Sequence, residues 1–135
     1  MTTTGSCFCG DVRFEIEGEL PDLYQCHCAL CRKVTGSSAN AALTVDLDRF
    51  RWTGATEGVR SFVRPTGYRN DFCGRCGSSV PNVTRDDGAM WIPAGLLDEP
   101  VTAVVAKHVY VASRAGWDVI GGDATLYDEA PDSWT

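Results

Sequence analysis

The residues best suited to chemistry in this 135-residue chain are seven cysteines, which fall into three groups. Every cysteine has another within three positions, and an odd number in such tight groups is a poor framework for disulfides. Thiolates at this spacing are typical zinc ligands. The spacing therefore predicts metal binding by Cys7-x-Cys9, Cys26-x-Cys28-x-x-Cys31 and Cys73-x-x-Cys76.

The seven thiols divide naturally into a set of four and a set of three. A structural zinc takes four protein ligands, whereas a catalytic zinc takes three and keeps one position open. We expect Cys7, Cys9, Cys73 and Cys76 to form a closed site that joins the N-terminal strand to a distant loop. The central triplet is local, because two residues three apart share a face of a helical turn. We expect Cys26, Cys28 and Cys31 to form a second site with one free coordination position.

Two alternatives remain at this stage. The triplet becomes a second structural site if a fourth ligand closes it, and the available candidates are His27, His108 or a carboxylate. The end pairs become an iron site of the rubredoxin type if iron replaces zinc, although the Cys7-x-Cys9 half is unusual for such a site.

Composition excludes some classes of protein. The 12 basic and 18 acidic residues give a net charge of −6, which argues against sequence-independent binding to nucleic acid. The most apolar stretch, residues 101–106, is far too short to span a membrane. The first five residues contain neither a basic nor an apolar leader segment. We therefore expect a single cytoplasmic domain over residues 1–135, with no nucleic-acid or membrane partner.

The elements that must position the thiols are mostly β-strands. Apolar and charged residues alternate over residues 12–17, which is typical of a half-buried strand. Residues 29–34 have helical composition and end at Gly36, which predicts one short helix. We expect the acidic tail, residues 123–135, to be loosely held. Further strands are predicted at residues 23–25, 39–45, 50–53, 60–64, 68–72, 90–94, 101–106 and 108–111.

Several other side chains have a predicted place. We expect Trp52, Trp91, Trp117 and Phe62 to lie in the core, as large aromatic side chains usually do. Arg32 and Lys33 directly follow the triplet, so they are candidates for a substrate-facing role.

Three segments resemble the glutathione-dependent formaldehyde-activating enzyme family, whose domain also occurs in centromere protein V. They are residues 5–12 (GSCFCGDV), 26–33 (CHCALCRK) and 72–78 (FCGRCGS). Residues 97–100 (LDEP), 107–111 (KHVYV) and Trp117 are also similar to the family, so the resemblance covers about residues 5–120.

The resemblance implies a mainly β, Mss4-like fold with little helix. It implies a structural zinc on Cys7, Cys9, Cys73 and Cys76 and a catalytic zinc on the triplet. It also implies a carbon–sulfur lyase activity on glutathione–aldehyde adducts, in which Arg32 and Lys33 are candidates to bind the carboxylates of glutathione. Two alternatives use the same fold: a glutathione-binding carrier or sensor, and a non-catalytic zinc adaptor.

Overall fold

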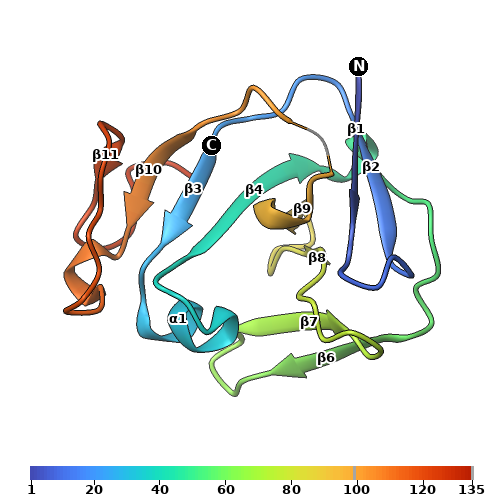
Figure 1. The fold of residues 1–135 in the computed structure, drawn as a ribbon, viewed down its shortest axis with the longest axis horizontal. Helices are drawn as coiled ribbons and strands as arrows, with labels where there is room; N and C mark the ends of the chain where they lie inside the picture. Colours follow the sequence, from blue (N-terminus) through green and yellow to red (C-terminus); the bar gives the residue numbers. More distant parts are fainter. Residues whose placement is uncertain (99, 135) are drawn as a thin grey trace.

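Short β-strands make up most of the structure, a computed structural model that describes residues 1–98 and 100–134 (Figure 1). Glu99 of the 97–100 segment and Thr135 of the tail lie outside the described residues. The expectation of a mainly β fold with little helix is confirmed. The strands are β1 (Thr2–Ser6), β2 (Arg13–Glu17), β3 (Leu23–Cys26), β4 (Asn40–Asp46), β5 (Phe50–Trp52), β6 (Val59–Val63), β7 (Arg69–Cys73), β8 (Asn82–Val83), β9 (Ala89–Pro93), β10 (Val105–Val109) and β11 (Thr125–Leu126).

These strands form three sheets. One has the order β1-β2-β5, the second β11-β10-β3-β4-β9-β8, and the third is the β6-β7 hairpin. Strand β10 runs parallel to its neighbours β3 and β11, whereas the other pairs are antiparallel. Because β10 lies between β3 and β11, it joins the C-terminal strand to the strand that leads into the cysteine triplet.

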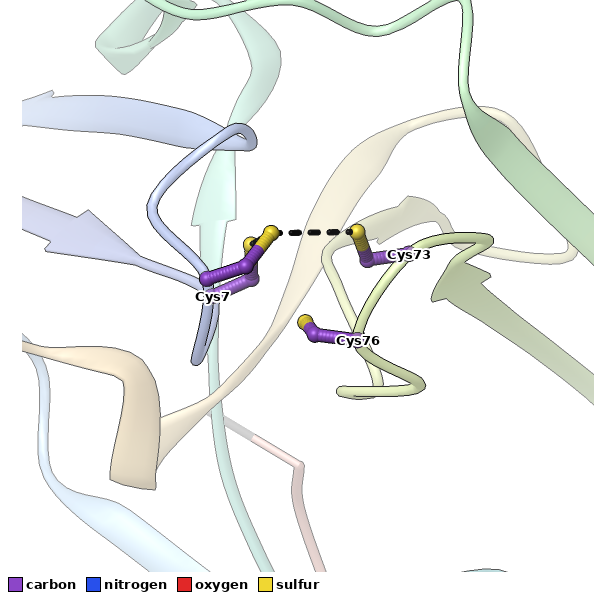
Figure 2. A group of neighbouring side chains, drawn as sticks. Cys7, Cys73 and Cys76 are labelled. Carbon is purple, nitrogen blue, oxygen red and sulfur yellow. Dashed lines mark hydrogen bonds between the residues drawn. The ribbon is translucent and has the colours of Figure 1, made fainter.

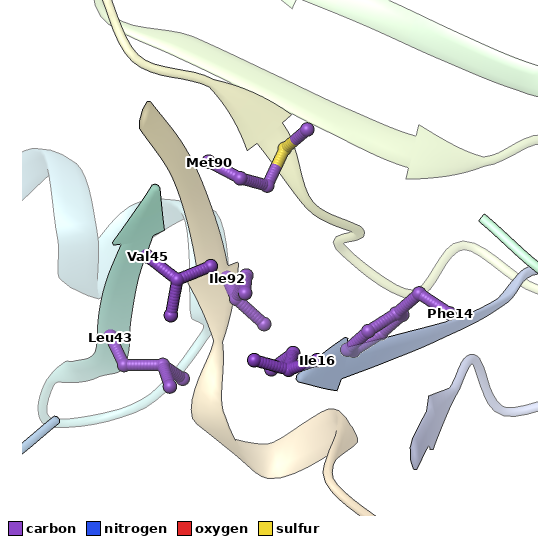
Figure 3. Close-up of a cluster of buried hydrophobic side chains, with 6 residues drawn as sticks. All are labelled: Phe14, Ile16, Leu43, Val45, Met90 and Ile92. Atoms are coloured by element: carbon purple, nitrogen blue, oxygen red, sulfur yellow. The ribbon is translucent and has the colours of Figure 1, made fainter. Parts of the chain in front are cut away.

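The main hydrophobic core lies between the first two sheets (Figure 3). The alternation predicted for residues 12–17 is confirmed, since Phe14 and Ile16 of β2 are fully buried. They face Leu43 of β4 and Ile92 of β9, which are also fully buried. Burying one such side chain contributes about 1.5–3 kcal/mol. This core fixes the framework to which both groups of cysteines are attached.

The predicted short helix is α1 (Ala29–Thr35). It begins at Cys28, whose side chain accepts a hydrogen bond from the Cys31 N–H, and it is capped by Gly36. Gly36 has a φ of 62°, the left-handed conformation that ends a helix most easily in glycine. Single 3-10 turns occur at η1 (Leu47–Arg49), η2 (Ala94–Leu96) and η3 (Val111–Ser113). No helix in the described part of the chain is both long and apolar enough to cross a membrane.

Two expectations near the C-terminus are wrong. Residues 101–104 form no strand; β10 begins at Val105 and continues through Lys107 and His108, because it pairs with β3. The acidic tail is docked rather than loose. Strand β11 pairs with β10, and backbone N–H groups of Tyr110, Val111 and Ala112 donate to carbonyls of residues 127–129.

The aromatic prediction is correct for Trp52, which packs against the main core. Trp91 is half-buried between the core residues Met90 and Ile92 of β9, and its indole N–H donates to the Tyr24 hydroxyl at 2.8 Å. Phe62 on the hairpin and Trp117 are 65% and 71% exposed, so they are not core residues. Four of the five residues of β6, Phe62 among them, are exposed, so this strand buries few side chains.

Candidate metal centres

The four-cysteine cluster is built from two tight turns. Cys7 and Cys9 lie in the turn between β1 and β2, while Cys73 ends β7 and Cys76 follows in the next turn. Each turn closes through a backbone hydrogen bond from a glycine, Gly10 N–H to the Cys7 carbonyl and Gly77 N–H to the Cys73 carbonyl. Figure 2 shows Cys7 on one turn facing Cys73 and Cys76 on the other.

The distances between the sulfurs fit a tetrahedral ion. All four Sγ atoms lie within 4.8 Å of one another. The Cys7–Cys9 and Cys9–Cys73 sulfurs are 3.6 Å and 3.8 Å apart. Zinc–sulfur bonds of about 2.3 Å in a tetrahedron place the sulfurs about 3.8 Å apart. The four cysteines brought together from the two ends of the sequence can therefore hold a metal ion.

The thiols of this cluster have very different pKa values. Hydrogen bonding to Ser78, whose Oγ lies 3.4 Å from Cys76 Sγ, lowers the pKa of Cys76 to about 5. At Cys9 a backbone hydrogen bond from Asp11 favours the thiolate, but burial and the neighbouring thiols outweigh it and raise the pKa to about 12. Crowding therefore prevents all four thiols from ionising together, and a cation at their centre removes that conflict.

The three-cysteine cluster is built within residues 26–31. Cys26 is the last residue of β3, Cys28 is the N-cap of α1 and Cys31 lies in the first turn of the helix. Their sulfurs lie within 4.8 Å of one another. Cys26 and Cys31 are buried, and Cys28 is partly exposed. The structure thus brings the triplet together from a strand end and a helix start, and this cluster can also hold a metal ion.

No fourth ligand closes the triplet within residues 1–98 and 100–134. The candidate His27 points elsewhere: its Nδ1 lies 3.0 Å from Asp118 Oδ2 and its Nε2 lies 2.9 Å from His108 Nδ1. These contacts also engage His108. Burial, and after it the nearby His27 ring, lowers the pKa of His108, which disfavours the protonated imidazole. Two of the candidates named from the sequence therefore pair with each other instead of joining the sulfurs.

Tyrosines surround the triplet. Tyr24, Tyr68, Tyr110 and Tyr127 pack against the cluster of Cys26, Cys31 and Val109. The Tyr68 hydroxyl lies 3.2 Å from Cys31 Sγ. Burial and the Cys31 sulfur raise the pKa of Tyr68, so its hydroxyl stays protonated and can donate to a thiolate. A hydrogen bond with Cys26, followed by burial, raises the pKa of Cys31 above its ordinary value.

The basic residues fall into different surroundings. Arg32 follows Cys31 on α1, and its Nη2 donates to the Ser113 carbonyl at 3.4 Å. Its Nε is buried, and the described residues offer it no hydrogen-bond partner. Lys33 is exposed on the same helix. Arg75 lies at the other cluster, where it pairs with Asp11. The structure thus leaves Arg32 and Lys33 as the cations adjacent to the triplet in sequence and on its helix.

Sequence reasoning missed Tyr68, Asp118 and Tyr127. Tyr68 lies 37 residues from Cys31, and Asp118 lies 91 residues from His27. Neither belongs to a spaced motif, so no local signal marks them. Tyr127 was hidden because it lies in the acidic tail, whose composition suggests a solvated segment.

The fold and the two clusters define a mainly β protein with two separate thiolate sites able to hold metal ions. The sequence profile of the family described as "Glutathione-dependent formaldehyde-activating enzyme" matches residues 2–113. The chain belongs to this family, as the three cysteine segments predicted.

Two relatives illustrate the range of similarity. A Halomonas elongata protein, provisionally named as a glutathione-dependent formaldehyde-activating enzyme, is 34% identical over 88 residues. The match covers 59% of this chain and 55% of that protein, about half of its length. The crystal structure of a Rhodobacter sphaeroides protein aligns with a TM-score of 0.59 at 22% identity. It covers 76% of this chain and 98% of that one, which shows a shared fold.

Proposed function

We propose that the protein is a zinc-dependent enzyme of carbon–sulfur chemistry that forms or cleaves S-hydroxymethylglutathione, or a related adduct of a thiol and an aldehyde. The observation that carries this proposal is the three-cysteine cluster. Its three sulfurs lie within 4.8 Å of one another, and among the described residues no fourth protein ligand joins them. In a member of the glutathione-dependent formaldehyde-activating enzyme family, such a cluster suits a catalytic ion with one exchangeable position.

The two clusters have different roles in this proposal. Cys7, Cys9, Cys73 and Cys76 hold a structural zinc, and Cys26, Cys28 and Cys31 hold the catalytic one. A zinc ion with an open position supplies two kinds of chemistry, since it lowers the pKa of a thiol that binds there and polarises a carbonyl oxygen. The hydroxyl of Tyr68, held protonated 3.2 Å from Cys31 Sγ, is a proton donor at this cluster.

The proposed reaction adds the S–H of glutathione across the C=O of formaldehyde. A carbon–sulfur bond forms, and the thiol proton ends on the new hydroxyl; the reverse reaction breaks the same bond. Ionisation alone contributes little. A thiol with a pKa of about 8.5 is roughly 3% ionised at pH 7, so full ionisation gains at most about thirtyfold. The lower nucleophilicity of a low-pKa thiolate offsets most of that gain.

Positioning of the two reactants must therefore supply much of the rate. Glutathione carries two carboxylates, and Arg32 and Lys33 on α1 are our candidates to bind them. Among the described residues the Arg32 guanidinium has one hydrogen bond, an exposed one from Nη2 to the Ser113 carbonyl, so other N–H groups of this side chain are left for a ligand. Arginine binds carboxylates through paired N–H groups, and this pairing fixes orientation as well as position.

We also propose that residues 1–135 act as one zinc-binding domain in the cytoplasm, where a reducing environment keeps the thiols available. Its partners would be small thiol and aldehyde molecules. Glutathione binding without turnover would make the protein a carrier or sensor instead.

Exchange spectroscopy tests the proposal. Zinc-replete protein is added to ¹³C-formaldehyde and glutathione at equilibrium, and the exchange rate between hydrated formaldehyde and S-hydroxymethylglutathione is measured by NMR. We expect the wild type to accelerate exchange and Cys28→Ser to lose the acceleration while remaining folded. Equal exchange rates with the wild type, with Cys28→Ser and without protein would overturn the enzymatic proposal.

A further inference from the structure

The segment that follows the family match makes direct contact with the surroundings of the three-cysteine cluster. The match ends at residue 113. Beyond it, Tyr127 packs against the cluster of Cys26 and Cys31, and β11 pairs with β10. Asp118 reaches His27, the residue that links two of the three cysteines. The residues C-terminal to the family match are therefore packed into the wall of this cluster.

His27 is held from three directions. Its backbone N–H donates to the Val109 carbonyl at 3.0 Å, and its ring is only 2% exposed. The ring nitrogens contact Asp118 Oδ2 at 3.0 Å and His108 Nδ1 at 2.9 Å. The Asp118 side chain is itself 9% exposed. The imidazole between Cys26 and Cys28 is thus fixed on both edges by buried or nearly buried partners.

Hydrogen-bonding rules assign the direction of each contact. An ionised carboxylate only accepts, so His27 Nδ1 carries the proton that points to Asp118. In the tautomer of His27 that carries its proton on Nδ1, Nε2 is an acceptor, and His108 Nδ1–H donates to it. The chain of hydrogen bonds therefore runs from His108 through His27 to Asp118. Asp118 is the last acceptor, and the direction of both hydrogen bonds depends on it.

We propose that the C-terminal segment is an integral part of the three-cysteine site, with Asp118 as a positioning residue that holds the Cys26–His27–Cys28 loop through the His27 ring. The part concerning metal retention rests on the proposed function, whereas the hydrogen bond itself does not.

The physical reason lies in the cost of releasing the ring. Without Asp118 the His27 Nδ1–H is buried and unpaired, and an unsatisfied buried donor is costly. The ring can escape this cost only by rotating or by changing its tautomer, and either change breaks the contact with His108. Because Cys26 and Cys28 are the residues on either side of His27, a rearranged loop displaces two ligands at once. Partners that orient metal ligands typically affect metal affinity by 10–100-fold.

The test compares Asp118→Ala, Asp118→Asn and a control, Asp123→Ala, which removes an exposed acidic residue of the same segment. Release of zinc to a chromogenic chelator is followed for each full-length protein. We expect a fast phase from the three-cysteine site and a slow phase from the four-cysteine site. Asp118→Ala should accelerate the fast phase about tenfold and leave the slow phase unchanged. Asp118→Asn, whose amide oxygen still accepts, should restore most of the wild-type rate, and Asp123→Ala should match the wild type.

Equal acceleration of both phases by Asp118→Ala would indicate general destabilisation and overturn the positioning role, as would no acceleration. A single release phase in the wild type would count against the proposed function, and the inference would then be decided on metal-free protein. Long-range ¹H–¹⁵N spectra should show His27 protonated on Nδ1 in the wild type, Asp118→Asn and Asp123→Ala, but not in Asp118→Ala. An unchanged His27 tautomer in Asp118→Ala would overturn the positioning role of Asp118.

Discussion

The two cysteine clusters are built from the same ligand type but in opposite ways. The four-cysteine cluster joins turns that lie 64 residues apart at Cys9 and Cys73, and it links the β1-β2 sheet to the β6-β7 hairpin. The three-cysteine cluster uses one stretch, residues 26–31, and takes its surroundings from tyrosines and the C-terminal segment. Strand β7 connects the two, since Tyr68 just before it contacts Cys31 and Cys73 ends it.

This difference shows how one small protein can use one metal site for stability and another for ligand binding. An ion that cross-links distant segments closes a long loop and so restricts the unfolded chain, whereas an ion bound within six residues closes only a short one. A four-thiolate set also leaves no room for a substrate. We therefore expect the first cluster to control folding and the second to control binding and reaction.

The largest predicted effect is loss of the fold when the four-cysteine cluster is broken. A structural zinc contributes an apparent ~10–16 kcal/mol, and a whole domain is stable by only ~5–15 kcal/mol. Cys9→Ser or Cys76→Ser should therefore give insoluble protein or a molten state. Far-UV and near-UV circular dichroism measure the loss.

Cys28→Ser is the matched variant at the other cluster. It should keep the wild-type dichroism, lose about one zinc per chain and lose glutathione binding. If Cys28→Ser unfolds the protein as thoroughly as Cys9→Ser, the three-cysteine site is structural and the comparison fails.

The next effect in size is the order in which the two metals leave during acidification. Protonation of a thiolate competes with the metal, so a raised thiol pKa moves release to higher pH. Each cluster contains a thiol with a raised pKa, Cys31 in one and Cys9 in the other, so the order of release follows from the number of ligands, three against four. Lowering the pH should therefore free about one equivalent of zinc first, with the dichroism unchanged. Simultaneous release of both equivalents, with unfolding, would show that the sites are not independent.

A smaller effect is predicted for Tyr68→Phe, which removes the hydroxyl 3.2 Å from Cys31 Sγ. A hydrogen bond to a charged group contributes about 1.5–3 kcal/mol. We expect zinc to bind the three-cysteine site about tenfold more weakly or worse, while the four-cysteine site is unaffected. Competition with a chelator of known affinity gives both constants. Equal weakening at both sites would mean that β7 transmits the change to Cys73.

The smallest effects concern the basic residues beside each cluster. Arg32→Gln should weaken glutathione binding several-fold, because it removes a charge-assisted contact to a carboxylate. Arg75→Gln removes an exposed pair with Asp11 at the other cluster, so affinity for glutathione should not change. Titration calorimetry distinguishes the two variants. Equal affinities for wild type and Arg32→Gln would remove Arg32 from the proposed binding site.

The sequence was informative wherever the signal was local. Cysteine spacing predicted both clusters, and the alternation at residues 12–17 predicted β2. Strand β1 was missed because its sequence, TTTGS, has no apolar residue and so no alternation. It also contains Gly5, which packs so closely against the Phe14 ring that any side chain there would overlap it. Asp118 and the docked tail depend on contacts between residues far apart in sequence, which composition and periodicity do not encode.

The visible spectrum of the protein with cobalt in both sites tests the central contrast most directly. Glutathione should change the cobalt–thiolate bands of about one equivalent, and S-methylglutathione, which has no free thiol, should not. Cys28→Ser, with cobalt only in the four-cysteine site, should respond to neither. Identical wild-type spectra with both ligands, or a response that persists in Cys28→Ser, would contradict an open three-cysteine site beside a closed four-cysteine one.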